Sequence, residues 1–482
     1  MKKINFNFNF RYNHKIGIFT LSSIFFLYLL YLSIPSLYDT GRVQKVFNDK
    51  FLTDFKLNVS LSTDISYRIL PQPHFFIKDA KLFYNKSNLP HEISQIKELK
   101  IFISKKNFFK KKNIEISKVE FNKSNFFLMK NDFIFFKKYI NNKFSEKKIV
   151  IKKSKLFLKD NNKNIIFIFT IGKSSLNFDS EENTNFISIK GGIFKIPIKV
   201  NWSKNFTTKK KTTEINTKKI SIDSFNEASL IEGKYEYENT LDFFSNRLKT
   251  IYKVLDNSIV FESKKSLIKS TPIKYNGNIN FKPFNFVINI NAKKIDLSYF
   301  LENIYLVNEL ISTKLLLNQN LYGKIFIYSE KVIKNKHFNK IDLNINFEEN
   351  EINLNNTILH GDKFGELEVY DSVLKSDDGF AILSAKLKLK IKNKDLFYKS
   401  FYIPKKNRKN IESLIFGINF KLNDRILIVK NILFEDKNYK IKNFDTVDQI
   451  ILANAQIKYD YFNPILFRNF IKKIIIAYSE EG

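Results

Sequence analysis

Strict alternation marks the stretch Leu383-Ser-Ala-Lys-Leu-Lys-Leu-Lys-Ile391. Its odd-numbered residues are apolar, and its even-numbered residues are Ser or Lys. Successive side chains of a β-strand point to opposite faces of a sheet, so the pattern predicts a strand with one apolar and one charged face. We expect five side chains to share the apolar face: Leu383, Ala385, Leu387, Leu389 and Ile391.

The same period of two recurs along most of the chain. It is clearest in residues 55–61, 65–69, 101–103, 114–116, 119–121, 156–158, 194–202, 279–281, 286–290, 325–327, 341–347, 352–354 and 426–432. Many half-apolar strands favour antiparallel sheet, and the pairs Asn276-Gly277 and Asp378-Gly379 are typical of hairpin turns. The sequence therefore predicts a mainly β protein.

Helical spacing interrupts this pattern in a few places. Apolar residues three and four apart predict an amphipathic helix over 43–51 and another over 241–255. Asp296 ends a strand pattern and leads into a predicted helix, with Ser298 as its N-cap. Asn463-Pro464 opens a further predicted helix to Tyr478, whose broad apolar stripe we expect to pack on the β body.

An uncharged apolar run extends from Ile16 to Ile34 and is followed by Pro35. As a helix it is about 28 Å long, close to the ~30 Å hydrocarbon core of a bilayer, so residues 16–35 are predicted to form a transmembrane anchor. A cleaved signal peptide is the alternative, but it would have a shorter apolar region and a small-residue cleavage site. Residues 1–15 carry basic and no acidic side chains, which predicts a cytoplasmic tail and a body outside the cytoplasm.

Composition narrows the classes of function. The 482 residues carry a formal net charge of +33 and no Cys, so disulfides cannot stabilise the body. The lysines are scattered rather than clustered, so we expect no nucleic-acid partner. We interpret the positive net charge instead as attraction to anionic lipid headgroups. The five histidines stand apart, Gly172-Lys173-Ser174 lacks the leading glycine of a phosphate loop, and no nucleophile motif is present. We therefore expect the protein to have no enzymatic activity and to bind no cofactor or metal.

A polar stretch, residues 203–219, is the best candidate for a domain boundary. It would act as a linker between an N-terminal β domain, residues 36–202, and a C-terminal α+β domain, residues 220–482.

Leu70-Pro71-Gln-Pro73 stands between two predicted strands, and the second strand carries the acidic–small pair Asp79-Ala80. With the anchor before it, this arrangement resembles the opening signature of the AsmA family, and Leu70, Pro71, Pro73 and Asp79 match its motif. Residues 96–127 resemble the family's recurring unit of strand, short helical turn (105–112) and strands. The usual Thr-Gly before the first strand is replaced by Thr53-Asp54, and the first hairpin has Thr63-Asp64 where the family has Gly.

The resemblance implies a single-pass protein of the Gram-negative inner membrane with a periplasmic body. That body would be an elongated, curved antiparallel sheet, a taco-like groove lined with apolar side chains as in bridge-like lipid transfer proteins. We therefore expect membrane phospholipids as partners, with a role in outer-membrane biogenesis by lipid binding or transfer, and the five apolar residues of 383–391 lining the groove. Ordinary protein core is the alternative for those residues. An assembly factor that influences the targeting or insertion of outer-membrane proteins is the alternative function.

Overall fold

The chain divides into two compact units in the computed structural model. Unit 1 comprises residues 1–193 and 197–211, and unit 2 comprises residues 194–196 and 212–482. The structure describes residues 10–86, 89–106, 108, 114–129, 132–159, 164–243, 246–296, 304–313, 315–335, 337–361, 364–377, 380–422, 424, 426–436, 441–443, 457–458 and 464–480.

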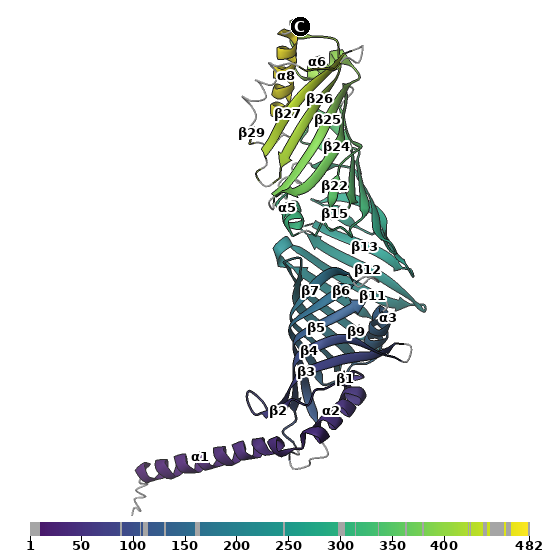
Figure 1. Ribbon diagram of the computed structural model, residues 1–482. Helices are drawn as coiled ribbons and strands as arrows, with labels where there is room; N and C mark the ends of the chain where they lie inside the picture. The colour runs from purple at the N-terminus through teal and green to yellow at the C-terminus, as the bar shows by residue number, and fades with distance from the viewer. Residues whose placement is uncertain are drawn as a thin grey trace, which may run out of the picture. The chain divides into compact units, whose positions relative to one another are not determined.

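Unit 1 begins with helices and continues as sheet (Figure 1). Its helices are α1 (Phe10–Ser33), η1 (Ile34–Leu37), α2 (Thr40–Phe55) and α3 (Phe133–Asn141). Its strands are β1 (Asn58–Ser60), β2 (Ile65–Arg68), β3 (His74–Lys86), β4 (Leu89–Ile103), β5 (Ile116–Met129), β6 (Lys148–Lys159), β7 (Ile165–Asp179), β8 (Thr184–Ile193) and β9 (Ile196–Asn205).

The first two helices have different roles. Residues Gly17–Leu37 are long and apolar enough to cross a membrane, the single such helix in the described part of the chain. Helix α2 is amphipathic, as predicted, and begins at the N-cap Asp39, which accepts a hydrogen bond from the backbone of Arg42 at 2.8 Å. Its buried stripe, Val43, Phe47, Phe51 and Phe55, packs on the apolar face of the unit 1 sheet.

The sheet of unit 1 is antiparallel from β3 to β5 and from β6 to β8, and β5 pairs with β6 in parallel. A parallel pair needs a crossover, and α3 lies in that connection. Three strands contain a residue with positive φ that has no partner in the strand pairing, which continues in the same register on both sides of it: Asp79 (φ 56), Lys123 (φ 54) and Lys153 (φ 47). A small buried residue follows each one: Ala80, Ser124 and Ser154. These bulges shift the alternation by one residue, so that the apolar side chains on both sides of each bulge stay on the same face.

Unit 2 continues the β pattern. Its strands are β10 (Lys211–Thr217), β11 (Ile222–Ile231), β12 (Lys234–Phe243), β13 (Asn246–Val254), β14 (Ser258–Ser263), β15 (Ser266–Ile268), β16 (Thr271–Phe281), β17 (Phe284–Ala292), β18 (Ile295–Asp296), β19 (Gly323–Ser329), β20 (Val332–Ile333), β21 (Phe338–Glu348), β22 (Glu351–Asn353), β23 (Thr357–Gly361), β24 (Gly365–Asp377), β25 (Phe380–Ile391), β26 (Ile411–Lys421), β27 (Ile426–Asp436), β28 (Ile441–Asn443) and β29 (Ile457–Lys458). Its helices are η3 (Lys218–Ile220), α5 (Ile304–Ser312), α6 (Lys394–Ser400), η4 (Lys405–Asn407) and α8 (Pro464–Glu480).

Sequence neighbours also pair in space through most of unit 2. Some short strands are skipped, so that β14 pairs with β16 and β22 with β24. Among the described pairs of its main sheet, β17–β19 is the parallel one, and its connection contains α5. The protein is therefore mainly β with a few helices, as predicted. Among the strand pairs whose direction the structure describes in the main sheets of the two units, all are antiparallel except β5–β6 and β17–β19.

Helix α8 closes one end of the apolar face of unit 2. Ile471, Ile474 and Ile475 are each 0% exposed and belong to a core with residues of β24–β27. This confirms the prediction that the last helix docks on the β body through its broad apolar stripe.

Three sequence-based predictions were wrong. Residues 241–243 and 246–254 belong to the paired strands β12 and β13 rather than to a helix, and Leu241 lies opposite Leu248. Asn276-Gly277 lies inside β16 rather than in a turn. A glycine stands there because the neighbouring strand is so close that a Cβ on Gly277 would lie 2.3 Å from the carbonyl oxygen of Val287. Residues 203–219 form the end of β9, a turn and β10 rather than an irregular linker, although the boundary between the two units, at residues 211 and 212, does lie within this stretch. Ser298, Asn463, Asp378-Gly379 and most of 105–112 lie outside the described residues.

Candidate functional site

One continuous row of apolar residues crosses the sheet of unit 2 at right angles to its strands. Each member lies directly opposite the next on the neighbouring strand. The row, here called the long apolar row, consists of Val254, Ile259, Ile279, Phe286, Gly323, Phe347, Ile352, Leu374, Leu383, Phe420 and Leu427. Strands are ~4.8 Å apart, so the row is about 50 Å long, or about three times the ~15 Å depth of one lipid leaflet's hydrocarbon.

Gly323 does not interrupt this apolar surface. The ring of Phe286 lies over it, since a Cβ on Gly323 would come within 2.4 Å of that ring. Phe286 also contacts Phe347 on the far side, with ring centroids 5.3 Å apart. Aromatic side chains thus cover the position where the row has no side chain of its own.

A second row runs beside the first on the same face. It consists of Ala228, Tyr237, Tyr252, Phe261, Gly277, Ile288, Ile325 and Ile345. Tyr237 and Tyr252 stack with ring centroids 5.1 Å apart. Together the two rows give this part of the sheet a broad apolar surface.

Protein covers the long apolar row unequally. In its middle, Phe347, Ile352 and Leu374 are buried in a cluster with Ile311 of α5. Towards β13 the covering decreases: Ile279 and Ile259 are half-buried, and Val254 is 48% exposed. A sheet face needs a second layer, so the open part between β13 and β17 is the best place on this face for an apolar ligand.

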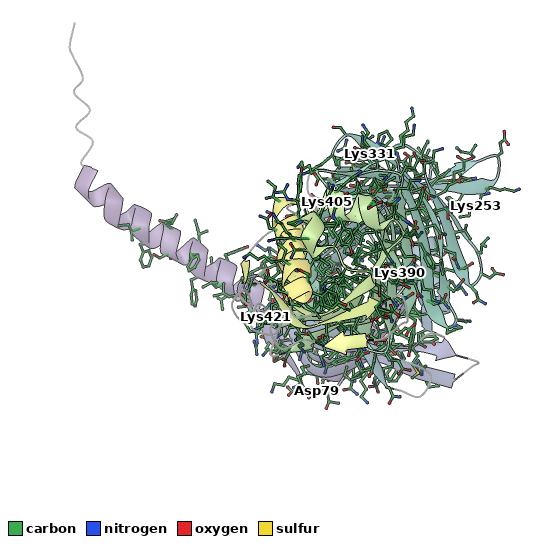
Figure 2. All side chains as sticks on the ribbon, turned by 90° about the horizontal axis from the view of Figure 1, so that it is seen from above. Asp79, Lys253, Lys331, Lys390, Lys405 and Lys421 are labelled. Carbon is green, nitrogen blue, oxygen red and sulfur yellow. The ribbon has the colours of Figure 1, made fainter. Side chains whose placement is uncertain are left out.

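The opposite face of the sheet carries charged side chains, and those of β25 are paired. In Figure 2, Lys253 points away from the interior of the curved sheet of unit 2. On β25 each Lys pairs with an acidic residue of a nearby strand: Lys386 with Asp371 (2.8 Å), Lys388 with Glu435 (2.8 Å) and Lys390 with Glu368 (2.5 Å). The hydrogen bond from Lys388, and then that from Ser413, holds the pKa of Glu435 below its usual range.

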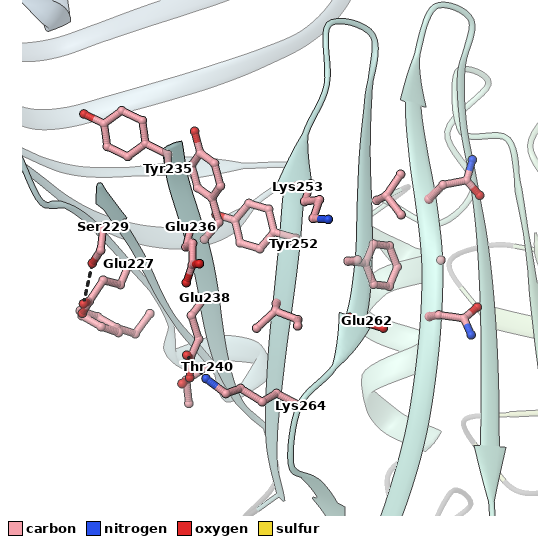
Figure 3. Close-up of a pocket in the computed structure, with 18 of the residues that line it drawn as sticks. Glu227, Ser229, Tyr235, Glu236, Glu238, Thr240, Tyr252, Lys253, Glu262 and Lys264 are labelled. Atoms are coloured by element: carbon pink, nitrogen blue, oxygen red, sulfur yellow. Dashed lines mark hydrogen bonds and ion pairs between the residues drawn. The ribbon is translucent and has the colours of Figure 1, made fainter. Parts of the chain in front are cut away.

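A hollow of about 950 Å³ lies along strands β11 to β17 (Figure 3). Its charged groups are partly paired, with Lys264 Nζ 2.9 Å from Glu238 Oε2 and Ser229 Oγ donating to Glu227 Oε1 at 3.3 Å. None of its lining residues is a His, and in the described residues no group of three His, Cys, Asp or Glu could hold a metal ion. The hollow combines partly paired charges with aromatic residues of the second row, Tyr237, Tyr252 and Phe261, and its described residues form no recognisable catalytic arrangement.

The structure separates the five residues predicted to line the groove. Ala385, Leu389 and Ile391 are 5%, 0% and 6% exposed in the core under α8, and Leu387 is half-buried against the same core. Only Leu383 belongs to the long apolar row. Four of the five therefore pack against the core under α8, and Leu383 is half-buried against the cluster that contains Ile311 of α5. The rows on β13–β19 were missed as a group, although residues 279–281, 286–290 and 325–327 already showed the alternation.

The motif residues of the resemblance lie around β3. Pro73 is buried, Leu70 is 79% exposed and Pro71 is exposed in the turn between β2 and β3. Asp79 is the exposed bulge residue of β3. They occupy a turn and a bulge rather than the apolar face.

Both units therefore present one apolar face that helices cover in part: α2 in unit 1, and α5 and α8 in unit 2. No protein-family model and no curated protein matches this chain.

Proposed function

We propose that this chain is an AsmA-like inner-membrane protein whose periplasmic body binds phospholipid acyl chains on its apolar sheet face. By binding or transferring these lipids it would support biogenesis of the outer membrane. The long apolar row carries the proposal, because it offers about 50 Å of aligned apolar side chains whose β13–β17 part is incompletely covered by protein.

The physical need for such a surface is clear for a lipid. Each methylene exposed to water costs about 0.8 kcal/mol, so an acyl chain leaves a membrane slowly unless an apolar surface receives it. A row that crosses hydrogen-bonded strands presents side chains at regular intervals, and its apolar character does not change from one strand to the next. The ligand would contact side chains such as Ile259, Ile279 and Ile288.

The anchor and the charge pattern also support the proposal. A single helix apolar enough to cross a membrane would keep the body near its lipid source. The charged face of β25 has its lysines in ion pairs, which favours solvent on that side. No catalytic step is assigned to the protein.

Two matched variants test the proposal on adjacent residues of β16. Ile279 belongs to the long apolar row, whereas Asn278 points to the opposite face and is also half-buried. The full chain is extracted in mild detergent, and native mass spectrometry counts the bound phospholipid. We expect Ile279→Glu to fold and to lose most bound phospholipid, because a carboxylate repels acyl chains, and Asn278→Glu to keep it.

Circular dichroism and limited proteolysis establish that both variants fold. A folded Ile279→Glu protein with its full complement of phospholipid would contradict the proposal. Co-purification of unfolded outer-membrane barrel proteins without phospholipid would instead favour the assembly-factor alternative.

A further inference from the structure

Two described residues of the β4–β5 connection in unit 1, Lys105 and Phe108, contact the end of the anchor helix. Lys105 Nζ donates to Tyr28 Oη at 2.9 Å, and Tyr31 Oη donates to the carbonyl of Lys105 at 2.5 Å. The rings of Tyr31 and Phe108 stack with centroids 5.2 Å apart. Tyr38 Oη also donates to the carbonyl of Phe108. These contacts tie the two residues to the helix at several points.

The position of these contacts along α1 sets the depth of the two residues. Apart from the half-buried Leu29, the large apolar side chains from Ile18 to Leu30 are 42–75% exposed, as expected of a surface that faces lipid, whereas Leu32 is 5% exposed in the core of unit 1. The uncharged run ends at Ile34, and Tyr28 lies six residues before it. Six residues of helix are about 9 Å long. A span of ~30 Å requires nearly the whole run, so Lys105 reaches at least the depth of the lipid headgroups.

The chemistry of the side chains there fits that depth. Lys105 and Lys106 are both exposed, and a Lys at a membrane boundary keeps its stem in apolar surroundings while its ammonium group reaches the phosphate layer. Tyr28 and Tyr31 are the aromatic type that is enriched at this boundary. Leu37, at the end of the same helical segment, is 78% exposed.

We propose that Lys105 and Lys106, at the start of the β4–β5 connection, dock on the bilayer surface and bind anionic phospholipid headgroups beside the anchor. The inference rests on the membrane anchoring in the proposed function but not on lipid transfer. Docking would hold the α2 end of the unit 1 sheet against the membrane, in addition to the single covalent connection through α1.

A fluorescence experiment on the full chain tests the docking. Because the sequence has no Cys, Lys106→Cys and the control Lys155→Cys on β6 can each carry one environment-sensitive fluorophore. The proteins are placed in phosphatidylcholine nanodiscs, with or without phosphatidylglycerol, that contain a headgroup-labelled quencher lipid. We expect several-fold stronger quenching at position 106 than at position 155. Equal quenching at the two positions would overturn the inference.

The charge dependence is tested in the same samples. Phosphatidylglycerol should increase the quenching at position 106, and salt at about 1 M, where the Debye length is about 3 Å, should reverse this increase. Adding Lys105→Glu should abolish the effect of phosphatidylglycerol, whereas adding Lys155→Glu should not. Quenching that is the same with and without the anionic lipid would overturn headgroup recognition. Quenching as expected in a protein that carries no phospholipid on its apolar rows would leave this inference standing while the proposed function fails.

Discussion

Lys219 and Glu309 form an ion pair that joins the turn after β10 to helix α5. On its other side, α5 reaches β25, where Asn308 Oδ1 accepts a hydrogen bond from the backbone N–H of Ala381 at 3.2 Å. The two contacts connect parts of the unit 2 sheet that are separated by many strands. Helix α5 is therefore held from both sides over the buried middle of the long apolar row.

Breaking the ion pair should loosen α5 without unfolding the unit. We expect Lys219→Glu to increase hydrogen exchange of the amides in Ile304–Ser312, because the variant places two negative charges together. Global stability should change by less than about 1 kcal/mol, since both side chains are partly exposed. The exposed neighbour Lys218 supplies the control: Lys218→Glu should leave exchange in α5 unchanged, and an equal increase in both variants would contradict the role of the pair.

Helix α8 should contribute strongly to stability through its buried stripe. Ile474 is 0% exposed, and we expect Ile474→Ala to lower the free energy of unfolding by about 2–5 kcal/mol through lost packing and the cavity left behind. Lys473 is exposed on the same turn, so Lys473→Ala should change it little. Denaturant titration of both variants measures the difference. Equal midpoints for the two would show that the docking of α8 adds no stability.

Stability should fall in acid partly through Glu435. The pKa of this carboxyl is lowered in the folded protein, chiefly by its hydrogen bond from Lys388. A lowered pKa contributes stability above the unfolded-state value near 4.3, and this contribution disappears as the pH falls through the folded-state pKa. We expect Lys388→Gln to be less stable than the unmodified chain at neutral pH, with the difference shrinking as the pH falls from about 5 to about 3.

Urea midpoints measured across this pH range test the prediction. Lys421→Gln, at the exposed end of β26, serves as the control and should follow the unmodified protein. A difference for Lys388→Gln that stays constant with pH would show that Glu435 does not titrate in this way.

The orientation of the anchor can be measured with single cysteines. The basic residues before the anchor predict that Lys3→Cys is cytoplasmic and Lys405→Cys periplasmic. An impermeant thiol reagent should label position 405, but not position 3, in cells whose outer membrane alone is permeabilised. Labelling of position 3 alone would reverse the proposed topology.

The strands could be predicted because apolar and polar side chains alternate between adjacent residues, as in Leu383–Ile391. Which strands pair, and where the alternation slips, depends on contacts that single-sequence periodicity does not contain. Asp79 and Lys123 look like ordinary polar positions, but each sits in a bulge with positive φ. The spacing of Leu241 and Leu248 fits a helical face as well as a hairpin, and the structure pairs them across β12–β13.

The candidate site was harder to locate than the fold. Leu389 and Leu383 follow the same alternation, but α8 covers the first, and the second belongs to the long apolar row. Alternation assigns a side chain to a face and says nothing of what lies on that face. The covering helix comes from residues 464–480, more than seventy positions further along the chain.

The long apolar row has a consequence for how such a protein can change its size. Each strand adds one side chain to the row, so a duplicated hairpin of matching register would lengthen the row by about 10 Å and leave the existing neighbours in place. A deletion of one hairpin would shorten it by the same amount. The length of the row therefore changes in steps of two strands, whereas helices α5 and α8 can keep their contacts with the strands that they cover.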